Sequence, residues 1–181
     1  MADLKEENQM FSRIRAKYTE FEHGLMRQGK LPMWDTGLGF WSGAPCDDIY
    51  ELFKDIRLQR FKHFIDLGSG DGRVVLIASL FTYSVGIEID KSLVEKAEEI
   101  KSELGIDNAL FHNKNFFQQD ITGHDIIFVN PDVPMQRGIE SKLLNEMRGR
   151  LIVFGHHFHP TLFLREKEFW INENFAVIYK R

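Results

Sequence analysis

Two carboxylates accompany a glycine-rich turn in the segment FIDLGSGDGR, which begins at Phe64. Asp66 precedes the turn and Asp71 lies inside it. The remaining residues of the turn are Gly68, Ser69, Gly70 and Gly72. Glycine lets the chain turn tightly and lets a ligand lie against bare backbone. Such a turn between a strand and a helix commonly holds a phosphate on helix amides, but Asp71 would repel a phosphate there. The two acids therefore indicate a ligand group that is not anionic.

The common nucleotide loops fit this turn poorly. The dinucleotide pattern G-x-G-x-x-G requires glycine where Arg73 stands, and no G-K-[ST] follows for a nucleoside triphosphate. A ligand with an adenosine half and a cationic half fits better, because Asp66 and Asp71 attract an ammonium or sulfonium group. Glu88, at the end of the next expected strand, can accept hydrogen bonds from two ribose hydroxyls. We therefore expect S-adenosylmethionine as the cofactor. The alternative is a turn that only packs a helix on a sheet.

The segments DLGSGDG and GIEID resemble two motifs of the class I S-adenosylmethionine-dependent methyltransferases. They stand where that family carries its glycine loop and its ribose-binding acid, and the resemblance extends from about residue 40 to the C-terminus. It implies that Asn115 lies at the adenine amine, where the family usually has an acid, and that Phe116 stacks on the purine. The resemblance thus implies cofactor contacts from Asp66, Gly68, Ser69, Gly70, Asp71, Gly72, Glu88, Ile89, Asn115 and Phe116.

The segment NPDV follows the fourth expected strand, where the methyl acceptor should lie, because ligands bind outside the carboxyl ends of parallel strands. Methyltransferases that act on planar amino groups resemble one another in an [DN]-P-P-[YF] motif at this place. This chain keeps Asn130 and Pro131 but carries Asp132 and Val133. The missing ring counts against a flat acceptor, and the added carboxylate suits a cationic one such as lysine. We expect Asn130 or Asp132 to orient the amine, and Asp132 or a histidine to accept its proton.

A second resemblance also favours lysine. GFWSGAPCDDIYELF before the glycine loop, VFGHHFHP after the fifth expected strand and a short terminal hairpin resemble small prokaryotic protein lysine methyltransferases. The resemblance implies an N-methyltransferase with a protein substrate, and we place Phe40, Trp41 and His156 on the substrate side. Two alternatives stay open. The acceptor is an amide, a nucleobase or a small amine, or the chain binds S-adenosylmethionine without catalysis.

The aromatic and histidine residues allow other interpretations. His157 and His159 would share one face of an extended segment, but no third and fourth metal ligand stands at an indicative spacing, so we expect no metal. Trp34, Phe40 and Trp41 form either a lid packed on the core or an aromatic channel for a methylammonium group.

The pattern of apolar residues predicts the elements that position these groups. An N-terminal helix is indicated by Phe11, Ile14, Tyr18, Phe21 and Leu25, which are three or four positions apart. Further helices are expected over 47–58, 74–81, 91–104 and 135–147, alternating with short apolar runs. This alternation predicts an α/β fold with a mostly parallel sheet. EKEFWI and FAVIYK read as a closing antiparallel hairpin. The expected fold is a Rossmann-like methyltransferase sandwich with an N-terminal helical extension.

Length and composition bound the remaining expectations. The 181 residues divide into an N-terminal helix and aromatic loop over 1–45 and a cofactor-binding domain over 46–181. The net charge of −4 gives no general attraction to nucleic acid, although nucleic acid is not excluded as a partner. Cys46 is the single cysteine, which favours the reducing cytoplasm, and no apolar run is long enough for a membrane. An oligomer could form through the N-terminal helix.

Overall fold

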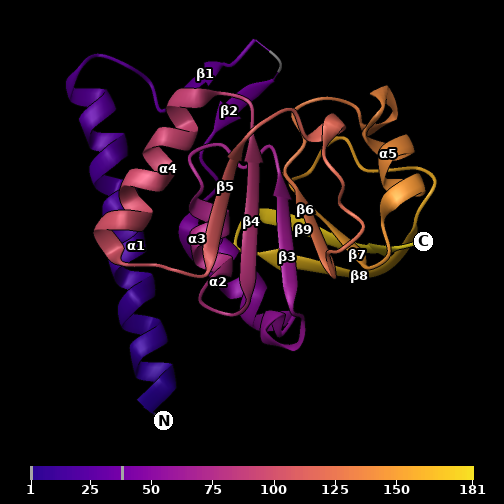
Figure 1. Ribbon diagram of the computed structural model, residues 1–181, viewed down its shortest axis with the longest axis horizontal. Helices are drawn as coiled ribbons and strands as arrows, with labels where there is room; N and C mark the ends of the chain where they lie inside the picture. Colours follow the sequence, from indigo (N-terminus) through magenta and orange to yellow (C-terminus); the bar gives the residue numbers. More distant parts are fainter. Residues whose placement is uncertain (1, 38) are drawn as a thin grey trace.

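The computed structural model describes residues 2–37 and 39–181, with side chains described from Lys5 onward (Figure 1). The helices are α1 (Ala2–Arg27), α2 (Cys46–Asp55), α3 (Arg73–Ala78), α4 (Lys91–Leu104) and α5 (Ile139–Glu146). The main strands are β3 (His63–Leu67), β4 (Tyr83–Glu88), β5 (Ala109–Asn113), β6 (Ile126–Val129), β7 (Arg150–Phe154), β8 (Leu164–Ile171) and β9 (Asn174–Lys180). Short 3₁₀ helices are η1 (Leu58–Arg60), η2 (Phe116–Gln118) and η3 (Met135–Arg137). A separate two-stranded hairpin consists of β1 (Met33–Asp35) and β2 (Phe40–Ser42), and we call it the tryptophan hairpin.

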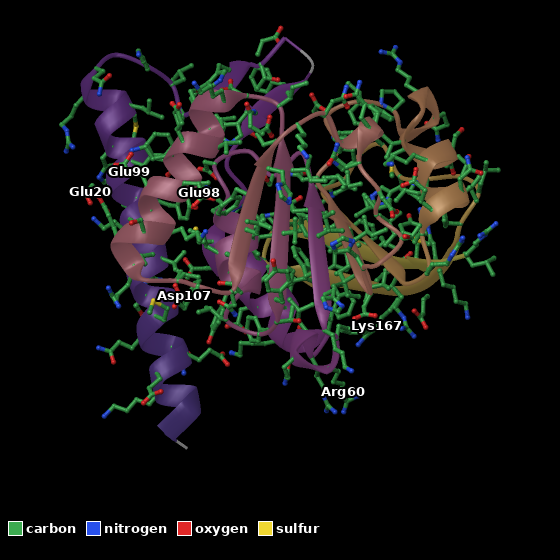
Figure 2. All side chains as sticks on the ribbon, viewed as in Figure 1. Glu20, Arg60, Glu98, Glu99, Asp107 and Lys167 are labelled. Carbon is green, nitrogen blue, oxygen red and sulfur yellow. The ribbon has the colours of Figure 1, made fainter. Side chains whose placement is uncertain are left out.

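The main sheet has the strand order β5-β4-β3-β6-β7-β9-β8. The five strands from β5 to β7 are parallel, whereas β9 runs antiparallel to both β7 and β8. This confirms the expected mostly parallel sheet with a C-terminal antiparallel hairpin. The carboxyl ends of β3, β4 and β5 meet at one edge, beneath the tryptophan hairpin (Figure 1). Arg60 and Lys167 lie toward the opposite edge (Figure 2).

Two hydrophobic clusters cover the two faces of the sheet. Successive side chains of a strand point to opposite faces of the sheet. In β3, Phe64 accordingly packs in one cluster, and Ile65 and Leu67 pack in the other. Helices α1 to α4 contribute to the first cluster and α5 contributes to the second. The chain is therefore a three-layer sandwich, with the sheet between two layers of helices. Both helical layers support the sheet edge at which the carboxyl ends of the strands meet.

Helix α1 is part of this core. Phe11, Ile14 and Tyr18 are buried in the same cluster as α2 and α3, and Phe11 stacks on Tyr50 with ring centroids 3.9 Å apart. The expected division at residue 45 therefore does not correspond to a second hydrophobic core. Since the apolar face of α1 packs within the chain, its role in an oligomer stays a prediction.

Some elements differ from their expected bounds. Helix α2 ends at Asp55 and α3 ends at Ala78, each three residues before the expected end. The helix expected over 135–147 is divided into η3 and α5, because Gly138 adopts a φ of 119°. The aromatic loop contains the tryptophan hairpin, in which Trp34 is paired across the strands with Trp41. No helix in the described part of the chain is long and apolar enough to cross a membrane.

Candidate active site

A cavity of about 680 Å³ lies at the carboxyl edge of the sheet, between the strand ends and the tryptophan hairpin. This volume is typical of small-molecule sites. The residues expected at the site that line this cavity are Phe40, Trp41, Gly68, Glu88, Ile89, Asn115, Phe116, Asn130, Asp132 and His156. Those expected at the site but absent from the lining are Asp66, Ser69, Gly70, Asp71 and Gly72. The structure thus brings the cofactor side and the acceptor side into one space.

The glycine loop turns immediately after β3. Gly68, Gly70 and Gly72 have φ values of 82°, 53° and 80°, the left-handed region that favours glycine. A Cβ atom added to Gly70 would lie 2.4 Å from Cδ1 of Trp41. Trp41 is itself buried and packs against Trp34, with ring centroids 4.3 Å apart. The tryptophan hairpin is therefore a lid packed on the glycine loop. This agrees with the first of the two interpretations of Trp34, Phe40 and Trp41, a lid and not a methylammonium channel.

Asp71 has a different role from the one its sequence position suggests. Its carboxylate binds the guanidinium of Arg73, with an Nη2–Oδ2 distance of 2.7 Å. Arg73 also pairs with Glu22 of α1 at 2.8 Å and donates to the carbonyl of Ala44. The Tyr18 hydroxyl donates to the Asp71 carbonyl at 2.8 Å. Because Arg73 already neutralises Asp71, this geometry does not support its expected attraction of a cationic ligand. Asp71 instead fastens the glycine loop to α1.

Asp66 is the acid of this region that has no cationic partner among the described residues. Its side chain is buried, and it accepts no hydrogen bond from the residues that the structure describes. Burial, followed by repulsion from Glu88 and Asp71, raises the pKa of Asp66 well above its usual range. The Ser69 hydroxyl is also buried and has no partner among the described residues. A cationic group near the loop would relieve the cost of the Asp66 charge.

Glu88 is oriented by backbone amides. Its Oε2 accepts from Gly70 N at 2.8 Å, and its Oε1 accepts from Ile89 N at 2.7 Å and Asp90 N at 2.8 Å. A carboxylate oxygen has two lone-pair directions, so one remains, on Oε2. With these amides in place, the carboxylate can accept from one ribose hydroxyl rather than the expected two.

The adenine side is formed by η2. The Oδ1 of Asn115 accepts from Phe117 N at 2.9 Å and caps this helix. One lone pair of that oxygen is therefore used, and its second lone pair and the amide nitrogen of Asn115 remain for a purine. Phe116 is partly buried against the second core cluster, whereas Phe117 is 46% exposed. Both rings line the cavity, so Phe116 combines a core contact with the expected ligand contact.

The acceptor side joins the loop after β6 to the tryptophan hairpin. The Asp132 carboxylate accepts a short hydrogen bond from the backbone amide of Phe40. Asn130 makes no side-chain hydrogen bond to any residue that the structure describes. The Oδ1 of Asn130 lies close to Gly155, since a Cβ atom added to that glycine would be 3.3 Å from it. Asn130 is therefore the polar group free to meet an acceptor, while Asp132 holds the hairpin.

Two histidines near β7 are fixed by backbone carbonyls. His156 Nε2 lies 2.8 Å from the carbonyl oxygen of Glu173, which can only accept, so this nitrogen carries the proton. The Nδ1 of neutral His156 then carries the lone pair. His159 Nε2 similarly donates to Gly155 at 3.0 Å, and its Nδ1 meets the Tyr179 hydroxyl at 2.8 Å. Burial is the main cause that lowers the pKa of His159, which is outside the cavity lining.

The histidines after β7 have protein partners. His159 is engaged by Tyr179 and Gly155, which does not favour the alternative interpretation of His157 and His159 as two metal ligands. Over residues 2–37 and 39–181, no three histidine, cysteine or acidic side chains come together in a way that could hold a metal ion.

Sequence reasoning missed several lining residues, among them Lys114, Arg137 and Phe158. Lys114 follows β5, so its place at the carboxyl edge could have been inferred from the strand pattern. Phe158 adopts a φ of 59°, which no local pattern indicates. Arg137 lies in η3, within the region expected to be one continuous helix.

The site fits a cofactor with an adenosine half and a cationic half. Glu88 offers a ribose acceptor and Phe116 and Ile89 offer apolar surface, while the buried carboxyl of Asp66, outside the lining, has no cationic partner among the described residues and would be favoured in its ionised form by a cationic ligand. The cavity also continues to Asn130, so the acceptor can enter beside the cofactor.

Several solved structures share this fold. An RNA methyltransferase from Salinibacter ruber in complex with S-adenosyl-L-homocysteine is 21% identical, with a TM-score of 0.65 over 76% of this chain and 92% of that chain. A variant of MtNAS in complex with S-adenosylmethionine is 16% identical, with a TM-score of 0.61 over 74% of this chain and 62% of that chain. A protein-L-isoaspartate O-methyltransferase is 20% identical, with a TM-score of 0.53 over 66% and 39% of the two chains.

The sequence itself matches one protein family. No curated protein matches the chain. Residues 59–157, more than half of the chain, match the family described as "Methyltransferase domain". This range includes the glycine loop, Glu88, η2 and the segment after β6. The chain therefore belongs to the methyltransferase domain family, as a class I enzyme whose cofactor is S-adenosylmethionine.

Proposed function

We propose that this S-adenosylmethionine-dependent methyltransferase methylates an amine nitrogen, and that its acceptor is a lysine side chain of a protein. The observation that carries the proposal is the composition of the acceptor side, where Asn130 and Asp132 stand beside aromatic rings and Val133 replaces the ring of planar-amine enzymes. An aliphatic amine needs a polar acceptor for its N–H groups and an apolar channel for its methylene chain. It does not need a ring to stack on.

The residues of the chain supply alignment and proton transfer. S-adenosylmethionine brings an electrophilic methyl group on a sulfonium centre. The Asn130 side-chain oxygen can accept a hydrogen bond from the acceptor amine and direct its lone pair. The unprotonated Nδ1 of His156 can accept the proton that the ammonium must lose. The tryptophan hairpin, which includes Phe40, limits the entry of water on this side of the cavity.

A nucleic acid acceptor is the second candidate, favoured by one specific observation. Lys114 and Arg137 line the cavity, and neither forms an ion pair within the described residues. Unpaired basic side chains at the mouth of a site are typical contacts for phosphates. The likeness to the RNA methyltransferase of Salinibacter ruber shows the fold and does not decide between the candidates.

Methyl transfer to fractionated cell extract tests the proposal. The enzyme is incubated with extract and S-adenosylmethionine carrying a radiolabelled methyl group, and the products are treated separately with protease and nuclease. We expect label in protein and methyl-lysine after acid hydrolysis. The Glu88→Ala protein is the matched control and should incorporate no label. Label that is released by nuclease and resists protease would support the nucleic acid candidate instead. Protein label that is lost in mild base would indicate carboxyl methylation and would overturn the lysine assignment.

A further inference from the structure

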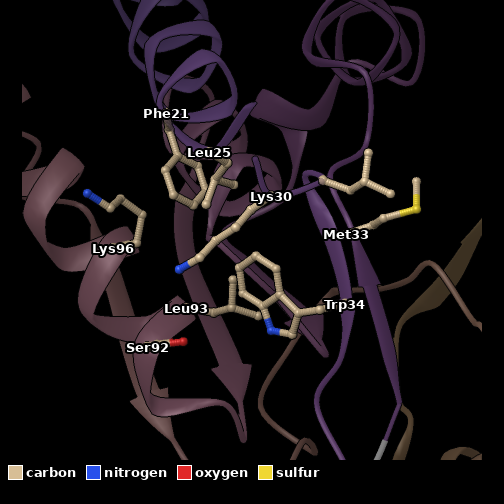
Figure 3. Close-up of a pocket in the computed structure, with 9 residues that line it drawn as sticks. Phe21, Leu25, Lys30, Met33, Trp34, Ser92, Leu93 and Lys96 are labelled. Carbon is tan, nitrogen blue, oxygen red and sulfur yellow. The ribbon is translucent and has the colours of Figure 1, made fainter. Parts of the chain in front are cut away.

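A second cavity, of about 730 Å³, lies outside the active site, between the C-terminal end of α1, strand β1 and the first turns of α4 (Figure 3). It is lined by Phe21, Leu25, Lys30, Leu31, Met33, Trp34, Ser92, Leu93 and Lys96. Leu31 and Met33 are 68% and 43% exposed, although both are apolar. The lining is therefore an apolar concave surface open to solvent, of a volume that suits a small ligand.

The charged side chains in this lining are all positive. Lys30 forms no ion pair within the described residues, and Figure 3 shows it reaching into the space between Leu25, Leu93 and Trp34. Lys96 pairs with Glu99 at 2.5 Å, and its ammonium lies 5.3 Å from the ring centroid of Phe21. Lys30 is thus the unpaired cation of an apolar lining, while Lys96 shares its charge with Glu99, and this combination favours a ligand that is both apolar and anionic.

Asp90, the N-cap residue of α4, contacts this lining through Trp34, and its charge is already stabilised. Its Oδ1 accepts from the amide and hydroxyl of Ser92, and its Oδ2 accepts from the Trp34 indole at 3.2 Å. Hydrogen bonds from Ser92 and Trp34 outweigh partial burial and lower the pKa of Asp90. The bond to Trp34 also fixes the indole as one wall of the cavity.

We propose that this cavity binds an amphipathic carboxylate, an alkyl or aryl chain with one carboxyl group. The chain would lie against Leu25, Leu93 and Trp34, and the carboxylate would meet Lys30 and Lys96.

Trp34 links the second cavity to the cofactor side. Its ring packs on Trp41, which covers Gly70, while its hydrogen-bond partner Asp90 donates its amide to Glu88 at 2.8 Å. A ligand that holds Trp34 in this position would stabilise the tryptophan hairpin over the glycine loop. It should therefore tighten S-adenosylmethionine binding, and the cofactor should tighten its binding by the same factor.

Titration with decanoate, below its critical micelle concentration, tests the site through tryptophan fluorescence, to which Trp34 contributes, and by calorimetry. We expect saturable binding at one site, with decanol and butyrate each at least about tenfold weaker. Lys30→Met and Lys96→Met should each weaken decanoate binding about threefold to fivefold. Lys91→Met, also on α4 but outside the lining, should bind decanoate as the wild type does.

Three results would overturn the proposal. They are no saturable binding of decanoate, equal binding of decanol, or equal binding by the two lysine variants and the wild type. Circular dichroism confirms that each variant is folded. Saturating decanoate should tighten S-adenosylmethionine binding about threefold in the wild type and not in Trp34→Leu. An unchanged cofactor affinity in the wild type would refute the link between the two sites.

Discussion

The guanidinium of Arg73 donates to both carboxylate oxygens of Asp71, and these two buried side chains lie two positions apart at the start of α3. The pair is continued by Glu22, whose Oε1 lies 2.8 Å from Arg73 Nη1. The glycine loop that faces the cofactor is therefore fastened, on its other side, to the N-terminal helix. Helix α1 belongs to the architecture of the site, although none of the residues that line the active-site cavity comes from it.

Replacing Arg73 by methionine should destabilise the protein by about 3–5 kcal/mol, because Asp71 would be left as an uncompensated buried charge. Urea unfolding followed by circular dichroism measures the change. Lys54→Met is the matched control, since it removes an exposed ion pair with Glu51 and should stay within about 0.5 kcal/mol of the wild type. The double change Arg73→Met with Asp71→Asn should recover part of the loss. If Arg73→Met were as stable as the control, the buried pair would have no structural importance.

Asp66→Asn should stabilise the ligand-free protein at neutral pH. The pKa of Asp66 is raised in the folded state above the ordinary value of 3.8, so the native state binds more protons than the unfolded state between those two values. In that window the stability of the wild type falls as pH rises, and the full penalty is present above the raised pKa. The urea midpoint of Asp66→Asn should therefore exceed that of the wild type by an amount that grows as pH rises. A difference between the two midpoints that does not change with pH would contradict the raised pKa of Asp66.

The same carboxylate should make cofactor binding depend on pH. A cationic ligand favours ionised Asp66, so S-adenosylmethionine should bind more weakly as pH falls through the raised pKa. Calorimetry in two buffers with different ionisation enthalpies should detect proton release on binding by the wild type. Asp66→Asn is expected to bind more weakly, with a smaller pH dependence and less proton release. Proton release that persists unchanged in Asp66→Asn would assign it to another group.

The strands and the position of the glycine loop could be predicted from the sequence, because alternation and turn residues are local signals. The partners of the charged residues could not. Nothing near Asp71 shows that Arg73 folds back onto it, nor that Glu22, 51 positions before Arg73, completes the cluster. The sequence alone therefore assigns Asp71 to a ligand, whereas its partner in the structure is Arg73. The interpretation of Asp66 rests on burial beside a strand end, which the apolar residues around it do indicate.

Asp132→Ala should loosen the tryptophan hairpin. The change removes the acceptor for the Phe40 amide and so weakens the contact between the loop after β6 and the hairpin. We expect S-adenosylmethionine to dissociate faster and its Kd to rise about fivefold, the effect of losing one hydrogen bond. Stopped-flow fluorescence of the hairpin tryptophans measures the rate. Asp107→Ala, an exposed acid far from the hairpin, is the control (Figure 2). An unchanged dissociation rate would show that Asp132 does not hold the hairpin.

His156→Gln should separate proton transfer from orientation. The amide nitrogen of glutamine can still donate to the Glu173 carbonyl, as His156 Nε2 does at 2.8 Å, but glutamine has no basic lone pair in place of Nδ1. If His156 accepts the proton of the acceptor amine, kcat should fall about 100-fold while the Kd for S-adenosylmethionine stays unchanged. Initial rates of label transfer to the protein fraction give kcat, and calorimetry gives the Kd.

His23→Gln, on α1 and outside the active-site cavity, is the control for a histidine change without effect on kcat. A wild-type kcat in His156→Gln would exclude His156 as the proton acceptor. A large rise in the cofactor Kd would instead show that the ring supports the cavity wall, where it lies 6.2 Å from the centroid of Phe175. A low kcat together with an unchanged cofactor Kd would identify Nδ1 of His156 as the proton acceptor. A group that acts only after the cofactor has bound lowers kcat without changing the Kd for the cofactor.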